Sequence, residues 1–449
     1  MRPLYFFLKL VLPYAYTVFF RRKKLVNSPG KFKSQTIYVS NHPSAFLDPL
    51  IVASVGRPIV FFMTRSDVFK DWLKPVTWAC QMVPIYRADQ DGSGTYDKNQ
   101  KVFKDIQKVL RRRGNLIMFG EGYTDNVFIR SLKPLKKGPP RIGFGTMEAT
   151  NWELDIKIQA VGINYANPDV FRSDVVISWG DPIRLKDYEE LYKENPSKTI
   201  LQLMRRVEKE IQENITYIED KTKAPFHERL MVLTRKGMSP NNFDKKYPVI
   251  DRMRYSQNLA KRINTEYKGD SEKWSELEGS VNAYFDTLQK KSIEDEFVHQ
   301  FQQKGRSKGL LAKWAFLILT FPLFLLGTIH NAVPYYITKL IVEKIFERRV
   351  FWSGVKVVLG GLFWLLYNLP IFWLFPEYIY PHIGVDGWLA FVISFVYFWT
   401  VPALTFIFWN HWKTKFGKTI RLGRIPSSDL EQALNARDEV MQKVNEMNI

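Results

Sequence analysis

The sequence contains very little cysteine and histidine: one cysteine, Cys80, and six histidines in 449 residues. A single cysteine excludes a disulfide framework and makes a cysteine-based metal site improbable. The histidines lack metal-ligand spacing, so no metal ion is expected. The GxSxG pattern of serine hydrolases is absent, and no pattern of a nucleic-acid-binding module is recognisable. These absences disfavour disulfide-rich, metal-dependent and GxSxG classes of protein.

Aromatic residues and positive charge are both abundant. The chain has 33 Phe, 21 Tyr and 13 Trp, with a formal net charge of +20. This combination argues against disorder and favours contact with anionic lipid surfaces, phosphorylated substrates or nucleic acid. The length predicts roughly two to three compact units.

Apolar stretches at both ends of the chain predict contact with a membrane. Residues 4–20 are mostly apolar and are followed by Arg-Arg-Lys-Lys, which predicts an interfacial or embedded anchor helix rather than a signal peptide. Residues 354–375 and 388–409 are each near the length of a membrane span. Residues 310–329 are also apolar, and we interpret them as one arm of a re-entrant hairpin that returns around Pro334.

The distribution of charge predicts an orientation for this region. Residues 377–386 contain no Lys or Arg and are expected outside, whereas the basic segments that flank the apolar stretches are expected inside. The catalytic part and a polar, helical tail would then face the cytoplasm. His330, His382 and His411 lie near the ends of apolar stretches and are interpreted as interfacial residues.

Between these apolar regions the pattern is that of an α/β domain. Short apolar runs predict strands at 37–39, 59–63, 82–86, 116–119, 156–164 and 175–179. Helical periodicity marks residues 98–113, whose outer face is strongly basic, and residues 187–216, with a restart at Pro196. Alternating strands and helices favour a sheet covered by helices. Residues 221–309 are polar and helical, without a strong site signature.

The stretch TIYVSNHPSAFLDPL, residues 36–50, carries the first candidate site. A short buried strand would deliver Asn41 and His42 to its carboxyl end, and Asp48 follows six residues after the histidine. A carboxylate near a histidine fixes its tautomer and orientation, which suits general-base chemistry. Ser44 is interpreted as a helix N-cap rather than a nucleophile.

Three further stretches belong with the first. MVPIYR ends in Arg87, a cation that suits a phosphate. In LIMFGEGYTDN, Gly120 and Gly122 flank Glu121, and glycines allow the backbone to approach a ligand closely. The segment KPLKKGPPR, residues 133–141, is a basic loop suited to anionic head groups.

The order of these blocks resembles that of the glycerolipid acyltransferases, the family of glycerol-3-phosphate and lysophosphatidic acid acyltransferases. The resemblance covers roughly residues 25–220. It implies an α/β fold with a mixed sheet flanked by helices, beside an N-terminal anchor helix and a C-terminal transmembrane region. Two departures are visible: five residues separate His42 from Asp48 instead of four, and Gly120 replaces the usual proline of the third block. The five-residue spacing looks like a branch that includes acyltransferases for glycerol 3-phosphate and dihydroxyacetone phosphate. It is also similar to that of bacterial lysophosphatidic acid acyltransferase-like proteins with an extended C-terminal membrane region.

The resemblance implies a role for individual residues. His42 would deprotonate the acceptor hydroxyl, and Asp48 would orient it. Substrate-binding roles are implied or predicted for Asn41, Ser44, Arg87, Glu121, Gly122, Thr124 and Lys137. The donor would be acyl-CoA or acyl-carrier protein, with no cofactor and no metal. The expected reaction acylates the sn-2 hydroxyl of 1-acyl-glycerol 3-phosphate to give phosphatidic acid, and the alternative acceptors are glycerol 3-phosphate and dihydroxyacetone phosphate.

The expected organisation has five parts: an anchor helix (1–25), a catalytic domain (26–220), a polar helical region (221–309), a transmembrane or re-entrant region (310–412) and a cytoplasmic tail (413–449). Two other classes of function remain open from the sequence. A membrane-bound hydrolase would use His42 to activate water, and a non-catalytic basic membrane scaffold would use neither His42 nor Asp48. Direct binding of nucleic acid is not expected.

Overall fold

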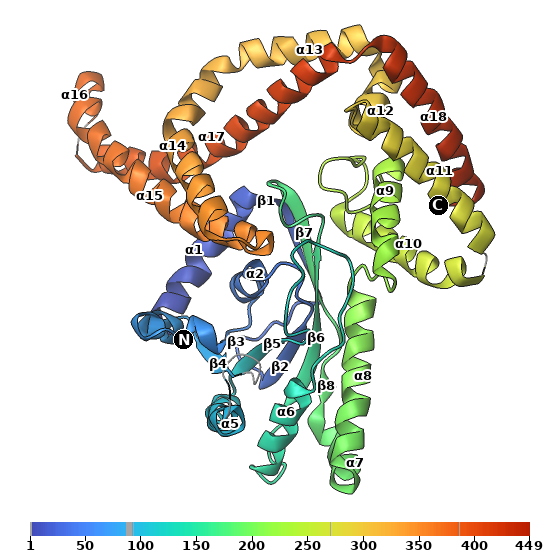
Figure 1. Ribbon diagram of the computed structural model, residues 1–449. Coiled ribbons are helices and arrows are strands. Elements are labelled where there is room, and N and C mark those ends of the chain that lie inside the picture. Colours follow the sequence, from blue (N-terminus) through green and yellow to red (C-terminus); the bar gives the residue numbers. More distant parts are fainter. Residues whose placement is uncertain (1, 87–91, 93, 270, 386) are drawn as a thin grey trace. The chain divides into compact units, whose positions relative to one another are not determined.

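The computed structural model describes residues 2–86, 92, 94–269, 271–385 and 387–449. The chain divides into two compact units. The first unit comprises Met1–Ala224 and Pro248–Lys261, and the second comprises Pro225–Tyr247 and Arg262–Ile449. The first unit contains the sheet, and the second unit is helical in its described part (Figure 1).

The sheet of the first unit is mixed. Its strand order is β1-β7-β6-β2-β5-β3-β4, and β8 pairs with β6. The pairs β6–β7 and β6–β8 are antiparallel, and the other pairs are parallel. The strands are β1 (Phe20–Val26), β2 (Thr36–Ser40), β3 (Val60–Arg65), β4 (Met82–Ile85), β5 (Asn115–Phe119), β6 (Lys157–Tyr165), β7 (Ser173–Trp179) and β8 (Ile183–Arg184). The predicted α/β fold with a mixed sheet flanked by helices is confirmed.

Helices cover both faces of this sheet. On one face, α5 (Thr95–Arg111), α6 (Gly138–Glu148) and α8 (Pro196–Asn214) contribute to a core that includes Ile37 and Val39 of β2. Because side chains alternate along a strand, Tyr38 faces the opposite side, where α1 (Pro3–Phe19) and α2 (Leu47–Val55) pack against each other. The other helical segments of this unit are α3 (Lys74–Ala79), α7 (Glu189–Glu194) and 3-10 turns at Ser66–Val68, Asp71–Leu73, Leu185–Tyr188 and Lys221–Lys223.

The six predicted strands are present. The structure also contains β1, which the sequence did not predict. The basic segment after the N-terminal helix forms β1, an edge strand that runs parallel to β7. Arg21 binds Asp174 of β7, with an Nε–Oδ1 distance of 3.1 Å. A run of four cations has no alternation of apolar and polar residues. Its pairing with β7 is what identifies this segment as a strand. Lysine on an edge strand also discourages pairing with a further chain.

The N-terminal helix α1 is docked onto the first unit along one face. Tyr5 and Tyr16 are buried, whereas Phe7 and Leu10 are 55% and 62% exposed. The Lys9 ammonium donates to the carbonyls of Ala53 and Gly56 at 2.8 and 2.6 Å, so it caps the end of α2. The lysine that interrupts the apolar segment therefore has an intramolecular partner, and the outward face of α1 remains apolar.

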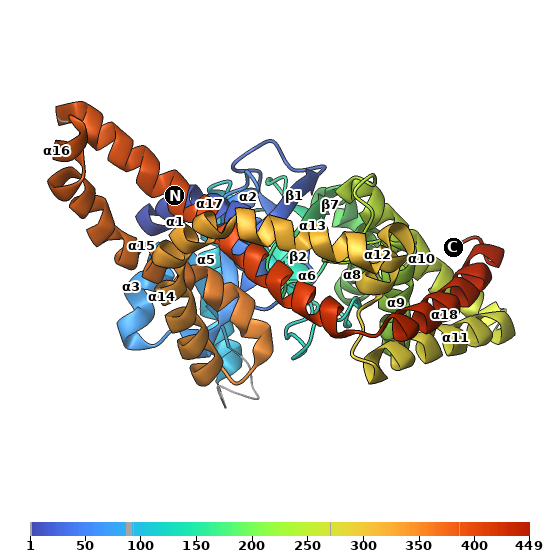
Figure 2. The ribbon, with the colours of Figure 1, turned by 90° about the horizontal axis from the view of Figure 1, so that it is seen from above.

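The second unit is built from long helices. Its elements are α11 (Ser271–Lys290), α12 (Asp295–Lys304), α13 (Arg306–Leu319), α14 (Phe321–Ile345), a 3-10 turn (Arg349–Phe351), α15 (Trp352–Tyr378), α16 (Tyr380–Ile383), α17 (Gly387–Arg424) and α18 (Ser427–Glu446). Two further helices, α9 (Ala224–Thr234) and α10 (Val249–Gly269), contain residues of both units. Within the second unit, α13 lies beside α17 and α11 lies beside α18 (Figures 1 and 2).

Two helical segments of this unit are long and apolar enough to cross a membrane. They are Arg349–His382 and Gly387–Arg424, and they contain the two predicted spans. A third candidate is the pair Gly309–Leu319 and Phe321–Ile345, which bends by 59° at the break between them. The bend lies at Thr320, whereas Pro334 lies inside the continuous helix α14. The expected hairpin turn around Pro334 is therefore wrong.

His330 also differs from its interpretation as an interfacial residue. Its side chain is buried among α14, α15 and α17, where Nδ1 lies 2.7 Å from Asn368 Oδ1 and Nε2 lies 2.7 Å from the Tyr397 hydroxyl. The last part of the chain is likewise packed. In α18, Arg437 binds the buried Asp295 with an Nε–Oδ1 distance of 2.9 Å. Residues 413–449 are thus the end of α17 and a helix that packs within the second unit.

Candidate active site

The first and third sequence blocks meet because β2 and β5 are adjacent and parallel. Both strands end at the same edge of the sheet, so residues that follow them come together. His42 lies two residues after β2, and Glu121 lies two residues after β5. The backbone N–H of His42 donates to Glu121 Oε1 at 2.6 Å. This bond fixes the main chain that carries the histidine.

The imidazole of His42 is held by Asp48. Asp48 lies in the first turn of α2 and is fully buried, and its Oδ2 is 2.8 Å from His42 Nδ1. The same oxygen accepts the backbone N–H of Ser44 at 2.8 Å. The ring of His42 stacks on Phe119, with 4.2 Å between the ring centroids. The hydrogen bond to Asp48 therefore holds one edge of the imidazole ring, and the stacking on Phe119 holds one face.

Tyr165 completes the surroundings of this carboxylate. It is the last residue of β6, and its hydroxyl donates to Asp48 Oδ1 at 3.0 Å. Tyr165 is not among the predicted site residues. A signal was present, because a tyrosine ends the apolar run of β6, but only the sheet order shows that it reaches Asp48.

Burial shifts the pKa values of Asp48 and Tyr165. Burial raises the pKa of Asp48, and the bonds from His42, Ser44 and Tyr165 oppose that rise without cancelling it. The pKa of Tyr165 is raised well above its ordinary value by burial and by the neighbouring Asp48 carboxylate. Tyr165 thus remains protonated, and a hydrogen-bond donor, at neutral pH.

The arrangement supports general-base chemistry. Because Oδ2 of an ionised Asp48 accepts hydrogen bonds, His42 presents a protonated Nδ1 to it and leaves Nε2 as an acceptor. Within the described part of the chain, Nε2 has no hydrogen-bond partner, and the side chain is 18% exposed. A hydroxyl group that approaches from solvent can therefore transfer its proton to Nε2, and Asp48 stabilises the resulting imidazolium.

Glu121 is engaged through both oxygens. Besides the His42 contact, Oε2 accepts the backbone N–H of Lys133 at 3.3 Å and lies 3.7 Å from the Lys133 ammonium. Burial raises the pKa of Glu121, and the His42 and Lys133 contacts oppose the rise. In the structure Glu121 positions the His42 backbone. Its predicted contact with an acceptor hydroxyl remains a prediction.

The turn that carries Glu121 explains the departure from the usual proline. The Gly120 N–H donates to the Ser40 carbonyl at 3.2 Å, a bond that proline could not make. A Cβ at Gly120 would lie 3.0 Å from Leu135 and 3.2 Å from Val39. Gly122 has φ +76°, and its N–H donates to the Phe119 carbonyl at 3.1 Å. Gly122 therefore suits the positive φ of this turn, and a proline in place of Gly120 would lose the bond to Ser40.

The remaining predicted residues fall in several places. Asn41 is buried, and its amide pairs with both backbone groups of Ile163, at 3.1 and 2.8 Å. Ser44 is not an N-cap, because α2 begins at Leu47 with Phe46 as its N-cap residue. The buried Ser44 Oγ has no hydrogen-bond partner among the described residues.

Two other predicted residues lie on the loop that follows β5 and at the start of α6. Thr124 is buried, whereas Lys137 is exposed and precedes α6 as its N-cap residue. Arg87 lies outside the described residues. The structure therefore brings together His42, Asp48 and Glu121 and adds Tyr165. Which of these residues contact substrate remains a prediction.

Comparison with known proteins agrees with this chemistry. Residues 18–163 match the family model described as Acyltransferase. This segment includes His42, Asp48 and Glu121. The α/β domain that carries the His42–Asp48 pair at the carboxyl edge of its sheet is thus similar to an acyltransferase domain.

Two proteins of Saccharomyces cerevisiae are more particular relatives. Glycerol-3-phosphate O-acyltransferase 2 is 26% identical over 136 residues, which cover 30% of this chain and 17% of that protein. Glycerol-3-phosphate O-acyltransferase 1 is 24% identical over 233 residues, which cover 51% of this chain and 30% of that protein. The chain therefore spans less than a third of either relative. Together, the family model and the relatives support a glycerolipid acyltransferase family.

Proposed function

We propose that this protein transfers a fatty acyl group from a thioester donor to a hydroxyl of a glycerol-phosphate acceptor. The observation that carries the proposal is the 2.8 Å contact between His42 Nδ1 and the buried Asp48 carboxylate, which leaves Nε2 as a base. The donor is acyl-CoA or acyl-carrier protein, and the chemistry requires no cofactor and no metal ion from the protein.

The proposed reaction is a direct transfer. The acceptor oxygen attacks the thioester carbonyl carbon while its proton moves to His42 Nε2. The carbon–sulfur bond of the tetrahedral intermediate then breaks, and the departing thiolate takes the proton from the imidazolium. Asp48 stabilises the imidazolium between these steps, and Glu121 holds the His42 backbone in place. Backbone N–H groups before α2 would stabilise the oxyanion.

Two acceptors follow from different observations. The resemblance in the motifs favours 1-acyl-glycerol 3-phosphate, whose sn-2 acylation gives phosphatidic acid. The two yeast relatives are both named glycerol-3-phosphate O-acyltransferases, which favours glycerol 3-phosphate equally. Arg87, Thr124 and Lys137 are the proposed contacts for the acceptor, with the cations on its phosphate.

We further propose that the protein is an integral membrane protein with its catalytic unit on the cytoplasmic face. Two long apolar helical segments support membrane association. The absence of Lys and Arg from residues 377–386 supports the orientation. Single cysteines introduced in this loop or in α18 would test the orientation. Their reactivity towards an impermeant maleimide in sealed vesicles measures which side of the membrane each one faces.

The direct test supplies labelled acyl-CoA or acyl-carrier protein to the purified full chain, with each acceptor separately. Phosphatidic acid formed from 1-acyl-glycerol 3-phosphate, and lost in His42→Ala, would support the second acylation step. A product from glycerol 3-phosphate alone would assign the first step. Release of free fatty acid without either acceptor would favour a hydrolase, and no turnover by the folded protein would favour a membrane scaffold.

A further inference from the structure

A cavity of about 710 Å³ lies in the first unit, away from the candidate active site. Its lining includes Lys33, Ile59, Met82 and Gly114, which lie at or just before the amino ends of β2, β3, β4 and β5. These strands are parallel, and His42 follows the carboxyl end of β2. At about 3.3 Å per residue, a five-residue strand places the cavity roughly 15 Å from the catalytic edge.

One wall of the cavity is held by a buried amide. Asn115 has no exposed surface, and its Oδ1 accepts the Ser34 N–H at 2.9 Å. Its Nδ2 donates to the carbonyls of Phe32 and Ile59, at 2.9 and 3.0 Å. The main chain is therefore fixed on both sides of Lys33, so the lysine is presented at the cavity by a rigid segment.

A second buried amide, that of Gln81, holds another part of the lining. Gln81 donates from Nε2 to the Val60 carbonyl at 2.9 Å and accepts the Arg2 N–H at 3.3 Å. Its φ of +61° is uncommon for a residue other than glycine and is maintained by these contacts. The Arg2 guanidinium lies 4.4 Å from the Trp78 ring centroid and 5.4 Å from that of Phe61. Two parts of the chain that are far apart in sequence thus build one aromatic wall.

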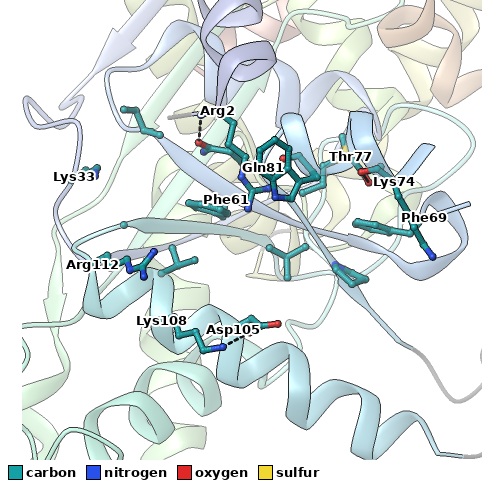
Figure 3. A pocket seen from close by; sticks show the side chains of 17 residues that line it. Arg2, Lys33, Phe61, Phe69, Lys74, Thr77, Gln81, Asp105, Lys108 and Arg112 are labelled. Carbon is teal, nitrogen blue, oxygen red and sulfur yellow. Dashed lines mark hydrogen bonds and ion pairs between the residues drawn. The ribbon is translucent and has the colours of Figure 1, made fainter. Parts of the chain in front are cut away.

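The lining combines positive charge with apolar surface. Figure 3 shows Lys33 and Arg112 at one end of the cavity, with Phe61 in the middle and Phe69 at the other end. Lys33 and Arg112 are exposed, and neither has an ion-pair partner among the described residues. Lys108 is paired with Asp105, the one acidic residue among the lining residues that the structure describes. Of the other lining cations, Arg2 donates to the Trp78 carbonyl and Lys74 pairs with Asp71. The cations whose side chains have no partner among the described residues therefore lie at the Lys33 end.

We propose that this cavity binds a phosphate-bearing molecule with an apolar or aromatic body. Its phosphate would bind Lys33 and Arg112, and its body would lie on Phe61 and Trp78. The volume suits a ligand of several hundred daltons. A guanidinium and an ammonium on a rigid wall suit a phosphate, and aromatic surface suits a nucleobase or an acyl chain. The nucleotide part of CoA and a phospholipid both have this chemistry.

This site differs from the acceptor site of the proposed acyl transfer. The acceptor must reach His42 at the carboxyl edge of the sheet, whereas Lys33 and Gly114 lie at the amino edge. A ligand in the cavity would therefore be the distant part of a long donor or a separate lipid. Binding can be measured without turnover, so it is independent of the outcome of the activity assay.

The test uses the purified full chain in detergent and two probes, adenosine 3′,5′-bisphosphate and dihexanoyl phosphatidic acid. Affinities are measured by isothermal titration calorimetry. The site variant is Lys33→Ser with Arg112→Ser. The matched control is Lys101→Ser with Lys104→Ser, which removes the same charge from exposed positions of α5 that do not line the cavity.

We expect the Kd of at least one probe to rise by about tenfold or more in the site variant, because two charged contacts are lost. The control should change it by less than about twofold, since surface charges at a distance contribute little. Loss of affinity for the bisphosphate would identify the nucleotide part of CoA, and loss for the lipid would identify a phospholipid. Equal affinities in the site variant and the control, or no binding of either probe to the unsubstituted protein, would overturn the proposal.

Discussion

The Tyr165 hydroxyl donates to Asp48 Oδ1 at 3.0 Å across 117 positions of sequence. It links the end of β6 to the first turn of α2, and so joins the antiparallel part of the sheet to the carboxylate that holds His42. Asp48 receives two further donors, the Ser44 N–H and His42 Nδ1. The carboxylate thus accepts three hydrogen bonds, two from the connection between β2 and α2 and one from β6, which favours one orientation of the His42 ring.

Removing the Tyr165 hydroxyl should weaken catalysis and change its pH dependence. In Tyr165→Phe, Asp48 loses a donor that opposes the effect of burial, so the pKa of Asp48 should rise further. A protonated Asp48 no longer holds the His42 tautomer. As the pH is lowered, the activity of the variant should therefore begin to fall at a higher pH than that of the unsubstituted protein. We expect kcat/KM at neutral pH to fall by about tenfold or more, the scale of one hydrogen bond to a charged group. The profile of kcat/KM against pH measures both effects.

A matched control for that variant is Tyr192→Phe. Tyr192 also donates to a carboxylate, that of Glu148 at 3.3 Å, but it lies in the core beneath α6. The control should leave the acid limb of the profile unchanged. An identical shift in both variants would show that Tyr165 acts only through general stability.

The substitutions His42→Ala and Asp48→Asn should both remove most activity while the protein remains folded. General-base catalysis contributes about 10²- to 10⁴-fold, and we expect kcat/KM to fall by that factor in each variant. The double variant should be little worse than either single one, because the two residues act as one unit. Circular dichroism and gel filtration would establish folding. Additive losses would contradict a coupled pair.

Glu121→Gln separates a positioning role from a binding role. A glutamine offers one carbonyl oxygen, but the carboxylate accepts backbone N–H groups from both His42 and Lys133. One buried N–H would face an NH₂ group, at a cost of about 1–3 kcal/mol. A positioning role predicts a lower kcat and a lower Tm. An increase in the KM of the acceptor with kcat unchanged would instead support the predicted contact with an acceptor hydroxyl. The exposed Glu153→Gln is the control.

The polar cluster around His330 should stabilise the helical bundle of the second unit. Asn368 Nδ2 donates to the carbonyls of His330 and Trp364, so its Oδ1 accepts from His330 Nδ1, and Tyr397 donates to Nε2. His330→Leu would leave Asn368 and Tyr397 without this partner. We expect a loss of about 1 kcal/mol in detergent, measured by reversible denaturation. Thr400→Val, at an exposed position of α17, should cost less, and equal losses would contradict a specific role for the cluster.

The local patterns of the sequence determined much of the fold. The buried strands have apolar runs because each is covered on both faces, and the helices α5 and α8 have one apolar face each. His42 and Asp48 are close in sequence, and the turn between β2 and α2 brings them together. Their pairing was therefore predictable from one stretch of chain. The long apolar helices were predictable because their composition alone suits a membrane.

Other features required the tertiary structure. The basic segment of β1 became a strand because β7 offers it a parallel edge, and Tyr165 reached Asp48 because β6 lies beside β2. The sequence placed His330 near the end of an apolar stretch, but neighbouring helices supplied its partners. Sequence by itself determines the properties of each segment, since these depend on nearby residues. The partners of a buried polar group depend on strand order and helix packing, which are decided only in the folded chain.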